Sequence, residues 1–185
     1  MAPPRYARKQ LTIIDQQTGV HHLPIVKSLT WPDEAATRLF AGALAVQPAL
    51  RDSFIELHGD LGAGKTSFVR HLLQALGVTG RIKSPTYAVL EPYELPGTRN
   101  DPAPLPIWHF DFYRFDDPRE WEDAGFRDIF AGPGLKLAEW PEKVAGRLPL
   151  ADLALHIDVQ ADAVRQVRLI AQTAVGAQLL GANGA

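Results

Sequence analysis

The 185-residue sequence contains no cysteine and a single methionine. The absence of cysteine excludes a disulfide framework, a thiolate metal site and a cysteine nucleophile. No apolar run approaches the roughly 20 residues that a membrane-spanning helix requires. The first ten residues carry charge and proline in place of the apolar segment of a signal peptide. These absences predict a cytoplasmic protein with no membrane segment.

An excess of positive charge is also missing. The chain has 19 Lys and Arg against 21 Asp and Glu, a formal net charge of −2, with the two signs interspersed. It therefore lacks the basic stripe of a protein that grips a nucleic-acid backbone by itself. Arg5, Arg8 and Lys9 form either a local patch or a solvated tail. The length predicts a single domain over 1–185, with a flexible segment over about residues 1–10 and a frayed tail from Gly181 to Ala185.

The segment from Gly59 to Thr66 reads GDLGAGKT and fits the phosphate-binding pattern G-x-x-x-x-G-K-[ST]. A short apolar run over 54–58 precedes it, as expected of a buried strand. Apolar residues follow it at helical spacing up to Gly77, at Phe68, Val69, Leu72, Leu73 and Leu76. A strand, a glycine loop and a helix are therefore predicted in the order that a P-loop requires.

In such a loop, backbone N–H groups surround phosphate oxygens at the positive end of the helix. Lys65 is expected to reach the β- and γ-phosphates, and the Thr66 hydroxyl to ligate Mg²⁺. The alternative is a glycine-rich turn with an exposed lysine, but the flanking strand and helix favour a P-loop. The chain has neither Asn-Lys-x-Asp for guanine recognition nor an Asp-x-x-Gly switch, which favours an adenine nucleotide.

The rest of the chain shows further strand and helix patterns. Thr30 is expected to cap a helix with Pro32 in its first turn and Asp33 at the capping-box position. The apolar residues of that helix predict its buried face as Ala36, Leu39, Phe40, Ala43 and Leu44. Strands are expected over 11–14, 23–26, 87–91, 107–113 and 135–140, with a closing hairpin over 153–159 and 164–170. A proline-rich loop over 94–106 and a charged helix over 118–130 complete the pattern.

Two acids stand near the ends of apolar strands, Asp111 after 107–110 and Glu139 after 135–138. A buried carboxylate needs a partner, and a P-loop needs a carboxylate at a neighbouring strand end to hold Mg²⁺. Either acid fits that role. The alternative for each is a pair with an arginine such as Arg114, or a cap on the following turn.

Ser84-Pro85-Thr86-Tyr87 lies about twenty positions after Lys65, where P-loop proteins often carry a segment that senses the γ-phosphate through a hydroxyl. The alternative is an ordinary proline turn that enters a strand. His109 shares a strand face with Asp111, but a buried and hydrogen-bonded histidine is favoured over a catalytic one, so it is not included among the site residues.

Four motifs in series resemble the TsaE (YjeE) family of small bacterial ATPases: the loop from Gly59 to Thr66, SPTY from Ser84, HFDFYR from His109 and AEWP from Ala138. The resemblance spans about residues 31 to 159. It implies an α/β fold of the P-loop NTPase type, a three-layer sandwich whose central sheet is mostly parallel with antiparallel edge strands. The loop over 94–106 is longer than the family needs, and the region after Gln160 diverges.

The resemblance also implies ATP and Mg²⁺ as cofactors, and a requirement for the protein, with TsaD and TsaB, in forming threonylcarbamoyladenosine at position 37 of tRNA. TsaD carries the transfer chemistry, and tRNA is reached through these partners. Thr66 and Glu139 would contact Mg²⁺, Asp111 would orient or activate water, and Ser84, Thr86 and Trp140 would form the switch. The implied catalytic set is Lys65, Asp111 and Glu139. The implied nucleotide contacts are Glu34, Asp60, Leu61, Gly62, Ala63, Gly64, Lys65, Thr66 and Ser67.

Two other functions remain open from the residues alone. A P-loop kinase acting on a small molecule is one, because Arg114, Arg119 and Arg127 are candidates for a lid over a second substrate. The other is a binding module in which ATP fixes a conformation and turnover is incidental. Retention of phosphate on an acceptor would favour the kinase. Full function without hydrolysis would favour the binding module.

Overall fold

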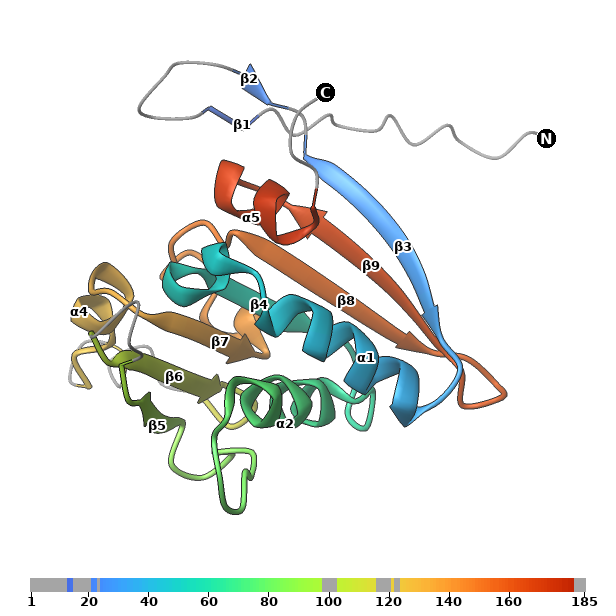
Figure 1. Cartoon of the computed structure of the whole chain (residues 1–185), viewed down its shortest axis with the longest axis horizontal. Coiled ribbons are helices and arrows are strands. Elements are labelled where there is room, and N and C mark those ends of the chain that lie inside the picture. Colours follow the sequence, from blue (N-terminus) through green and yellow to red (C-terminus); the bar gives the residue numbers. More distant parts are fainter. Residues whose placement is uncertain are drawn as a thin grey trace.

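The computed structural model describes residues 13–14, 21–22, 24–97, 103–115, 121 and 124–181. A seven-stranded sheet runs in the order β3, β9, β8, β4, β7, β6, β5 (Figure 1). Its strands are β3 (Ile25–Trp31), β4 (Phe54–His58), β5 (Leu90–Leu95), β6 (Leu105–Asp111), β7 (Leu135–Glu139), β8 (Leu153–Val159) and β9 (Arg165–Ala171). A separate pair joins β1 (Ile13–Ile14) to β2 (His21–His22).

The middle of the sheet is parallel. β4 runs parallel to both of its neighbours, β7 and β8, and β6 runs parallel to β7. β9, β3 and β5 are antiparallel additions on the two sides. The predicted α/β class, with a parallel centre and antiparallel outer strands, is confirmed, as is the closing hairpin formed by β8 and β9. Since β4, β7 and β6 point the same way, their carboxyl ends meet at one edge.

Helices lie on both faces of this sheet. α1 (Glu34–Ala45) and α2 (Lys65–Leu76) contact each other across one face (Figure 1). α4 (Phe126–Ala131) packs against the opposite face, and α5 (Ala174–Leu179), which the sequence patterns did not predict, contacts β8 and β9. Two short 3₁₀ turns are η1 (Pro48–Asp52) and η2 (Pro141–Val144). The predicted three layers are therefore present.

Alternation along the strands builds a hydrophobic core on each face. Ile55 and Leu57 of β4 are fully buried in the cluster that includes α1 and α2. Phe54, which precedes them, points the other way and joins Phe110 of β6 and Phe126 of α4. The two clusters fix the sheet between its helical layers.

α2 follows the predicted spacing. Its core-facing residues have 0% exposure, namely Phe68, Val69, Leu72 and Leu73. The helix ends where predicted, because Gly77 adopts the left-handed conformation with φ of 101°, which favours glycine. The P-loop helix is thus held along its length by the core.

The start and buried face of α1 differ from the prediction. Asp33 is the N-cap, and its Oδ1 accepts a hydrogen bond of 2.8 Å from the Ala36 N–H. The predicted cap, Thr30, lies in β3, which pairs with β9 over all seven of its residues. The helix is rotated so that its buried residues are Thr37, Ala41 and Leu44. Of the predicted face only Leu44 is fully buried, Ala36 and Phe40 are partly buried, and Leu39 and Ala43 are exposed.

The strand predicted over 87–91 begins only at β5. Its first three residues belong to a turn, in which Val89 has a φ of 65°. The preceding hydroxyls of Ser84 and Thr86 both donate hydrogen bonds to Asp111. Side-chain bonds of this kind favour a turn over a strand, and this tertiary contact was not visible in the local sequence.

β6 starts and ends two residues before the predicted strand over 107–113. It pairs with β5 as far as Leu95 and Leu105, so the predicted loop over 94–106 is shorter. The helix predicted over 118–130 is seen as α4, which ends at Gly132, and as a helical Trp121.

Several predicted features lie outside the described residues. These are the flexible segment over 1–10, residues 11–12 and 23 of the two early strands, part of the 94–106 loop, part of the 118–130 helix with Arg119, and the tail from 182 to 185. Within the described ranges, no helix has the length and apolar character needed to cross a membrane.

Two histidines stack on neighbouring strands, His58 at the end of β4 and His156 in the middle of β8. The ring centroids of His58 and His156 are 4.4 Å apart. Burial, together with the neighbouring charges of His58 and Arg168, lowers the pKa of His156 to about 4 from its usual 6.5. The unfolded chain therefore takes up this proton near pH 6.5 and the folded chain only near pH 4. The free energy of unfolding therefore keeps its full value above about pH 6.5 and decreases as the pH falls from there towards 4.

We expect His156→Phe, which keeps a ring against His58, to flatten this part of the stability profile. A shift of this size corresponds to about 3 kcal/mol, which the partial solvent exposure of the ring reduces to about 1–2 kcal/mol. Urea unfolding near pH 7 and near pH 4.5 measures the difference for both proteins. An equal loss of unfolding free energy in the wild type and the variant would contradict this role for His156.

Candidate functional site

The glycine loop connects the end of β4 to the start of α2. Gly59 has a φ of 140°, and a Cβ there would lie 2.4 Å from the Ile157 carbonyl oxygen. Gly64 has a φ of 107°, and a Cβ there would lie 2.9 Å from Nε of Arg165. Gly59 is required by conformation and by space, and Gly64 by its conformation. The loop therefore passes close under β8 and β9 before α2 begins at Lys65.

Lys65, the first residue of α2, is buried next to the loop. Its Nζ donates to the carbonyl of Gly59 and, at 2.9 Å, to that of Asp60. Nζ also lies 3.8 Å from the centre of the Trp140 ring. Burial lowers the pKa of Lys65, while the nearby carboxylates, Glu139 first among them, oppose that shift. The ammonium group is held by carbonyls and a ring, not by a carboxylate.

Trp140 owes its position to a change of backbone direction. The strand predicted over 135–140 ends one residue early, and Trp140 has a left-handed φ of 57° that starts η2. Its ring then lies 4.9 Å from that of Tyr113 and beneath Lys65. A left-handed non-glycine residue costs of order 1 kcal/mol, which the surrounding contacts offset.

Glu139 is the last residue of β7 and is only 2% exposed. Thr66 Oγ1 donates to its Oε2 at 2.9 Å, and His109 Nε2 lies 2.9 Å from its Oε1. His109 is fully buried, and its Nδ1 has no hydrogen-bond partner. The histidine that was not included in the predicted site therefore contacts a predicted metal ligand directly.

Asp111 ends β6, beside Glu139 in the parallel register. Its Oδ2 accepts hydrogen bonds from Ser84 and, at 2.8 Å, from Thr86, and its Oδ1 accepts one of 3.0 Å from the Tyr113 N–H. Of the alternatives considered for this carboxylate, the pair with Arg114 is not formed, whereas the cap on the following turn is present as the bond from the Tyr113 N–H. The Arg114 guanidinium lies over the Tyr87 ring, 4.5 Å from its centre. Asp111 therefore connects the sheet to the predicted switch segment.

A groove of about 620 Å³ brings most of the predicted site residues together. Those that line it are Leu61, Gly62, Gly64, Lys65, Thr66, Ser67, Ser84, Thr86, Asp111, Glu139 and Trp140. Three others do not line it. Asp60 and Ala63 contribute carbonyls to Lys65 and Arg165, and Glu34 contacts His71 on α2 at 2.9 Å. Arg127 lies on α4, away from the groove.

The donor set suits a hard cation that keeps other oxygen ligands. In the described part of the chain, no cluster of three or more His, Asp or Glu is arranged to hold a metal by itself. The Thr66 hydroxyl and the Glu139 carboxylate form a pair of oxygen donors beside the loop. Mg²⁺ is commonly bound through one or two such groups, with phosphates and water completing its shell. The residues therefore fit magnesium held jointly with a phosphate ligand.

Arg165 is a site residue that the sequence did not reveal. It begins β9, lines the groove, and its Nε donates to the Ala63 carbonyl at 2.9 Å. It lies in the region after Gln160 to which no role was assigned. Its position depends on β9 lying beside β8 and β8 beside β4. No local motif signals that order.

The central strand, the glycine loop, the helix after it and a carboxylate at the end of the neighbouring parallel strand define an α/β protein of the P-loop class. The model of one family, described as threonylcarbamoyl adenosine biosynthesis protein TsaE, matches residues 31–168. The chain therefore belongs to the TsaE family, as its four motifs predict. The role of this family lies in tRNA threonylcarbamoyladenosine biosynthesis.

Individual relatives agree with this assignment. The chain is 45% identical over 128 residues to the tRNA threonylcarbamoyladenosine biosynthesis protein TsaE of Haemophilus influenzae, covering 69% of this chain and 76% of that protein. It is 34% identical over 155 residues to the TsaE of Bacillus subtilis, covering 82% and 89%. The crystal structure of Bacillus subtilis YdiB matches with a TM-score of 0.65 and 26% identity, covering 87% and 95% of the two chains.

We expect Asp111→Ala to loosen the turn over 84–89, because it removes the acceptor that Ser84 and Thr86 share. Loss of these bonds corresponds to about 1–3 kcal/mol, or about a 5- to 150-fold increase in amide exchange if the turn opens locally. Hydrogen exchange followed by mass spectrometry measures it on peptides from this segment. Asp158→Ala, at an exposed carboxylate of β8, is the control, and equal exchange in the two variants would contradict the proposed anchoring.

Proposed function

We propose that the protein binds ATP with Mg²⁺ in the groove and hydrolyses it, and that it acts with TsaD and TsaB in forming N6-threonylcarbamoyladenosine at tRNA adenosine 37. Family membership supports the place of this chain in tRNA threonylcarbamoyladenosine biosynthesis. The near-neutral charge agrees with a protein that reaches tRNA through partners. On this proposal the protein works in the cytoplasm.

The observation that carries the proposal is the hydrogen bond between Thr66 and Glu139 beside the loop lysine. It places a hydroxyl and a buried carboxylate 2.9 Å apart at the start of the P-loop helix. When bound, Mg²⁺ would neutralise charge that develops on the phosphates. Thr66 and Glu139 would hold the metal, and the loop amides would hold the phosphate oxygens at the positive end of α2.

Lys65 would exchange its present partners for phosphate. Its ammonium now bonds to two carbonyls of its own loop. A triphosphate offers more negative charge than those carbonyls, and a charge-assisted hydrogen bond is about twice as strong as a neutral one. The Trp140 ring below Nζ limits where the lysine can turn. The Lys65 ammonium group therefore already lies close to the position in which it would bind phosphate.

Asp111 would orient or activate the attacking water. In this structure its two oxygens are occupied by the hydroxyls of Ser84 and Thr86 and by the Tyr113 N–H. Movement of the two hydroxyls towards a γ-phosphate would free one carboxylate oxygen to bind water. The turn after Ser84 would in this way report nucleotide state to a partner surface.

The decisive experiment is steady-state ATP hydrolysis by the purified protein, alone and then with TsaD, TsaB and tRNA. We expect the partners to stimulate hydrolysis, and Asp111→Asn to lower the stimulated rate by about 10²-fold or more, as for loss of a positioned general base. Nucleotide binding by the variant, measured separately, serves as the control. No stimulation, with label from ATP retained on a small acceptor, would support the kinase alternative instead.

Glu139→Gln should raise the Mg²⁺ concentration required for half-maximal hydrolysis more than Asp111→Asn does. The amide keeps the shape of the side chain but removes the charge that faces the metal. A magnesium titration of both variants at saturating ATP compares them directly. The reverse order would show that the roles of the two carboxylates have been exchanged.

A further inference from the structure

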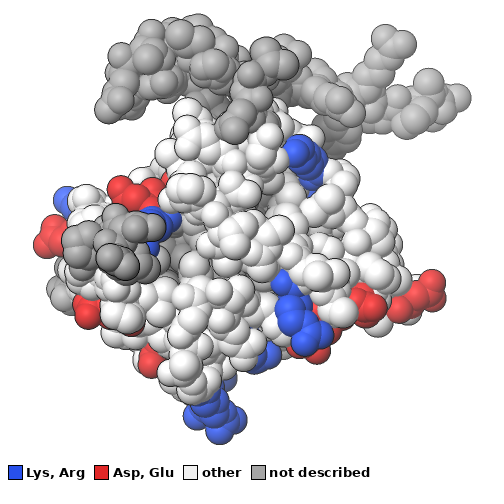
Figure 2. All heavy atoms as spheres, in the orientation of Figure 1, with Lys and Arg blue, Asp and Glu red and all other residues white. Residues whose placement is uncertain are grey.

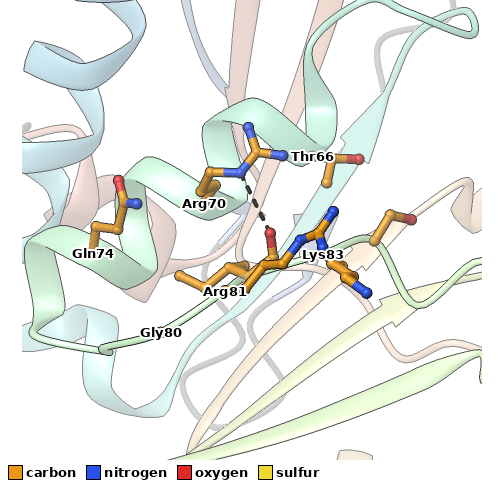
Figure 3. Close-up of a pocket in the computed structure, with 8 residues that line it drawn as sticks. Thr66, Arg70, Gln74, Gly80, Arg81 and Lys83 are labelled. Carbon is orange, nitrogen blue, oxygen red and sulfur yellow. Dashed lines mark hydrogen bonds between the residues drawn. The ribbon is translucent and has the colours of Figure 1, made fainter.

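A second cavity adjoins the groove on the outer side of α2 (Figure 3). Its volume is about 560 Å³. Its lining comes from α2 and from the segment that leads to the switch turn, namely Thr66, Arg70, Gln74, Gly80, Arg81, Ile82, Lys83 and Ser84. Thr66 and Ser84 also line the nucleotide groove. The two cavities therefore meet at the predicted metal ligand and the predicted switch.

Positive charge dominates this second cavity. Arg70, Arg81 and Lys83 line it, and no Asp or Glu does. Within the described ranges, none of these three cations forms an ion pair. Figure 2 shows Lys and Arg atoms along the lower edge of the molecule, in the region below α2 in Figure 1. Three cations around one hollow repel one another unless an anion lies between them.

The hydrophobic core fixes the position of the segment that lines this cavity. Ile82 is only 4% exposed and belongs to the hydrophobic cluster that packs against α2. Nε of Arg70 donates to the Ile82 carbonyl at 3.4 Å, the dashed line in Figure 3. Arg81 and Lys83 flank this anchored residue and are exposed. The Arg70 guanidinium keeps further N–H groups for a ligand, because the bond to Ile82 uses only Nε.

We propose that this cavity binds a phosphate group of a ligand other than the hydrolysed nucleotide. Guanidinium groups bind phosphate in a bidentate geometry with charge-assisted hydrogen bonds. Thr66 and Ser84 add hydroxyls where the cavity adjoins the groove. A free phosphate or phosphate monoester carries up to two negative charges, and an RNA backbone carries one on each successive phosphate, so either source offers the three cations more negative charge than a single carboxylate does. The proposal goes beyond nucleotide hydrolysis and does not depend on it.

A phosphate at this position would influence the switch. Ser84 is at the border of the cavity, and its hydroxyl donates to Asp111. A ligand that competes for this hydroxyl would alter the bond between the switch and the sheet. Phosphate binding in the second cavity and the hydrogen bonding of Asp111 are therefore coupled through the side chain of Ser84.

Two sources share this chemistry, the backbone phosphate of an RNA and a free phosphate or phosphorylated small molecule. The first arm of the test uses inorganic phosphate as its probe, followed by ³¹P NMR line broadening, with protein that carries Lys65→Ala to weaken the P-loop as a phosphate site. We expect Arg81→Ser with Lys83→Ser to weaken phosphate binding by about tenfold or more. Arg38→Ser with Arg147→Ser removes two exposed cations that line neither cavity and should leave binding unchanged.

The second arm uses an unmodified tRNA transcript with Lys65 intact and fluorescence anisotropy at two salt concentrations. An RNA source predicts weaker tRNA binding by Arg81→Ser with Lys83→Ser than by the control pair, and a salt slope lower by about 1–2. A free phosphate source predicts equal tRNA binding by the two pairs, with the phosphate difference retained.

Equal phosphate binding together with equal tRNA binding by the two variant pairs would overturn the proposal. Thermal unfolding of all variants verifies that the comparison is between folded proteins. ATP hydrolysis is measured on the same pairs with Lys65 intact. Absence of hydrolysis in the wild type under every condition would refute the proposed function and leave the phosphate result standing.

Discussion

The site depends on the hydrogen bonds made by the buried carboxylate of Glu139. A carboxylate that is 2% exposed must be hydrogen-bonded to be tolerated. Its two oxygens contact Thr66 and His109, and so join β7 to the first turn of α2 and to β6. The parallel pairing of β4, β7 and β6 brings these groups to the same edge of the sheet. These two hydrogen bonds add to the core packing that holds the helix and the strand ends in one arrangement.

A second carboxylate, that of Asp111, holds the turn after Ser84 in place. The hydroxyls that bind it belong to a segment without regular secondary structure, so its position depends on side-chain contacts and on the burial of Ile82. Segments with few backbone ladder bonds open at low free-energy cost. A rigid sheet edge and a less constrained turn therefore share one carboxylate.

The two cavities on either side of Thr66 and Ser84 follow from the same geometry. α2 presents its first turn to the groove, and one turn further along it presents Arg70 to the second cavity. The groove contains the carboxylates and Lys65, whereas the second cavity is lined by cations without acids. A single helix thus contributes side chains both to a site suited to a metal with phosphate and to an adjoining one suited to phosphate alone.

Local patterns predicted the elements whose own residues carry a regular apolar spacing. The strand before the loop and the helix from Lys65 to Gly77 were predicted because their apolar residues face a core at regular spacing. The predicted face of α1 was wrong at Leu39 and Ala43, which are exposed, because apolar residues at helical spacing fit more than one rotation and the contacts with β3 and α2 selected one of them. The turn before β5 was predicted as a strand because its partner, Asp111, lies 25 or more positions further on.

By itself the sequence determined the glycine loop, the lysine and threonine that start α2, and the two carboxylates at strand ends. These depend on residue type and short spacing, so the motifs suffice to place them. Only the tertiary structure decided that Arg165 reaches the loop from a position 102 residues beyond Ala63, that His109 contacts Glu139, and that three cations surround a second cavity. Strand order and helix packing bring these groups together, and neither is encoded in any contiguous segment of the chain.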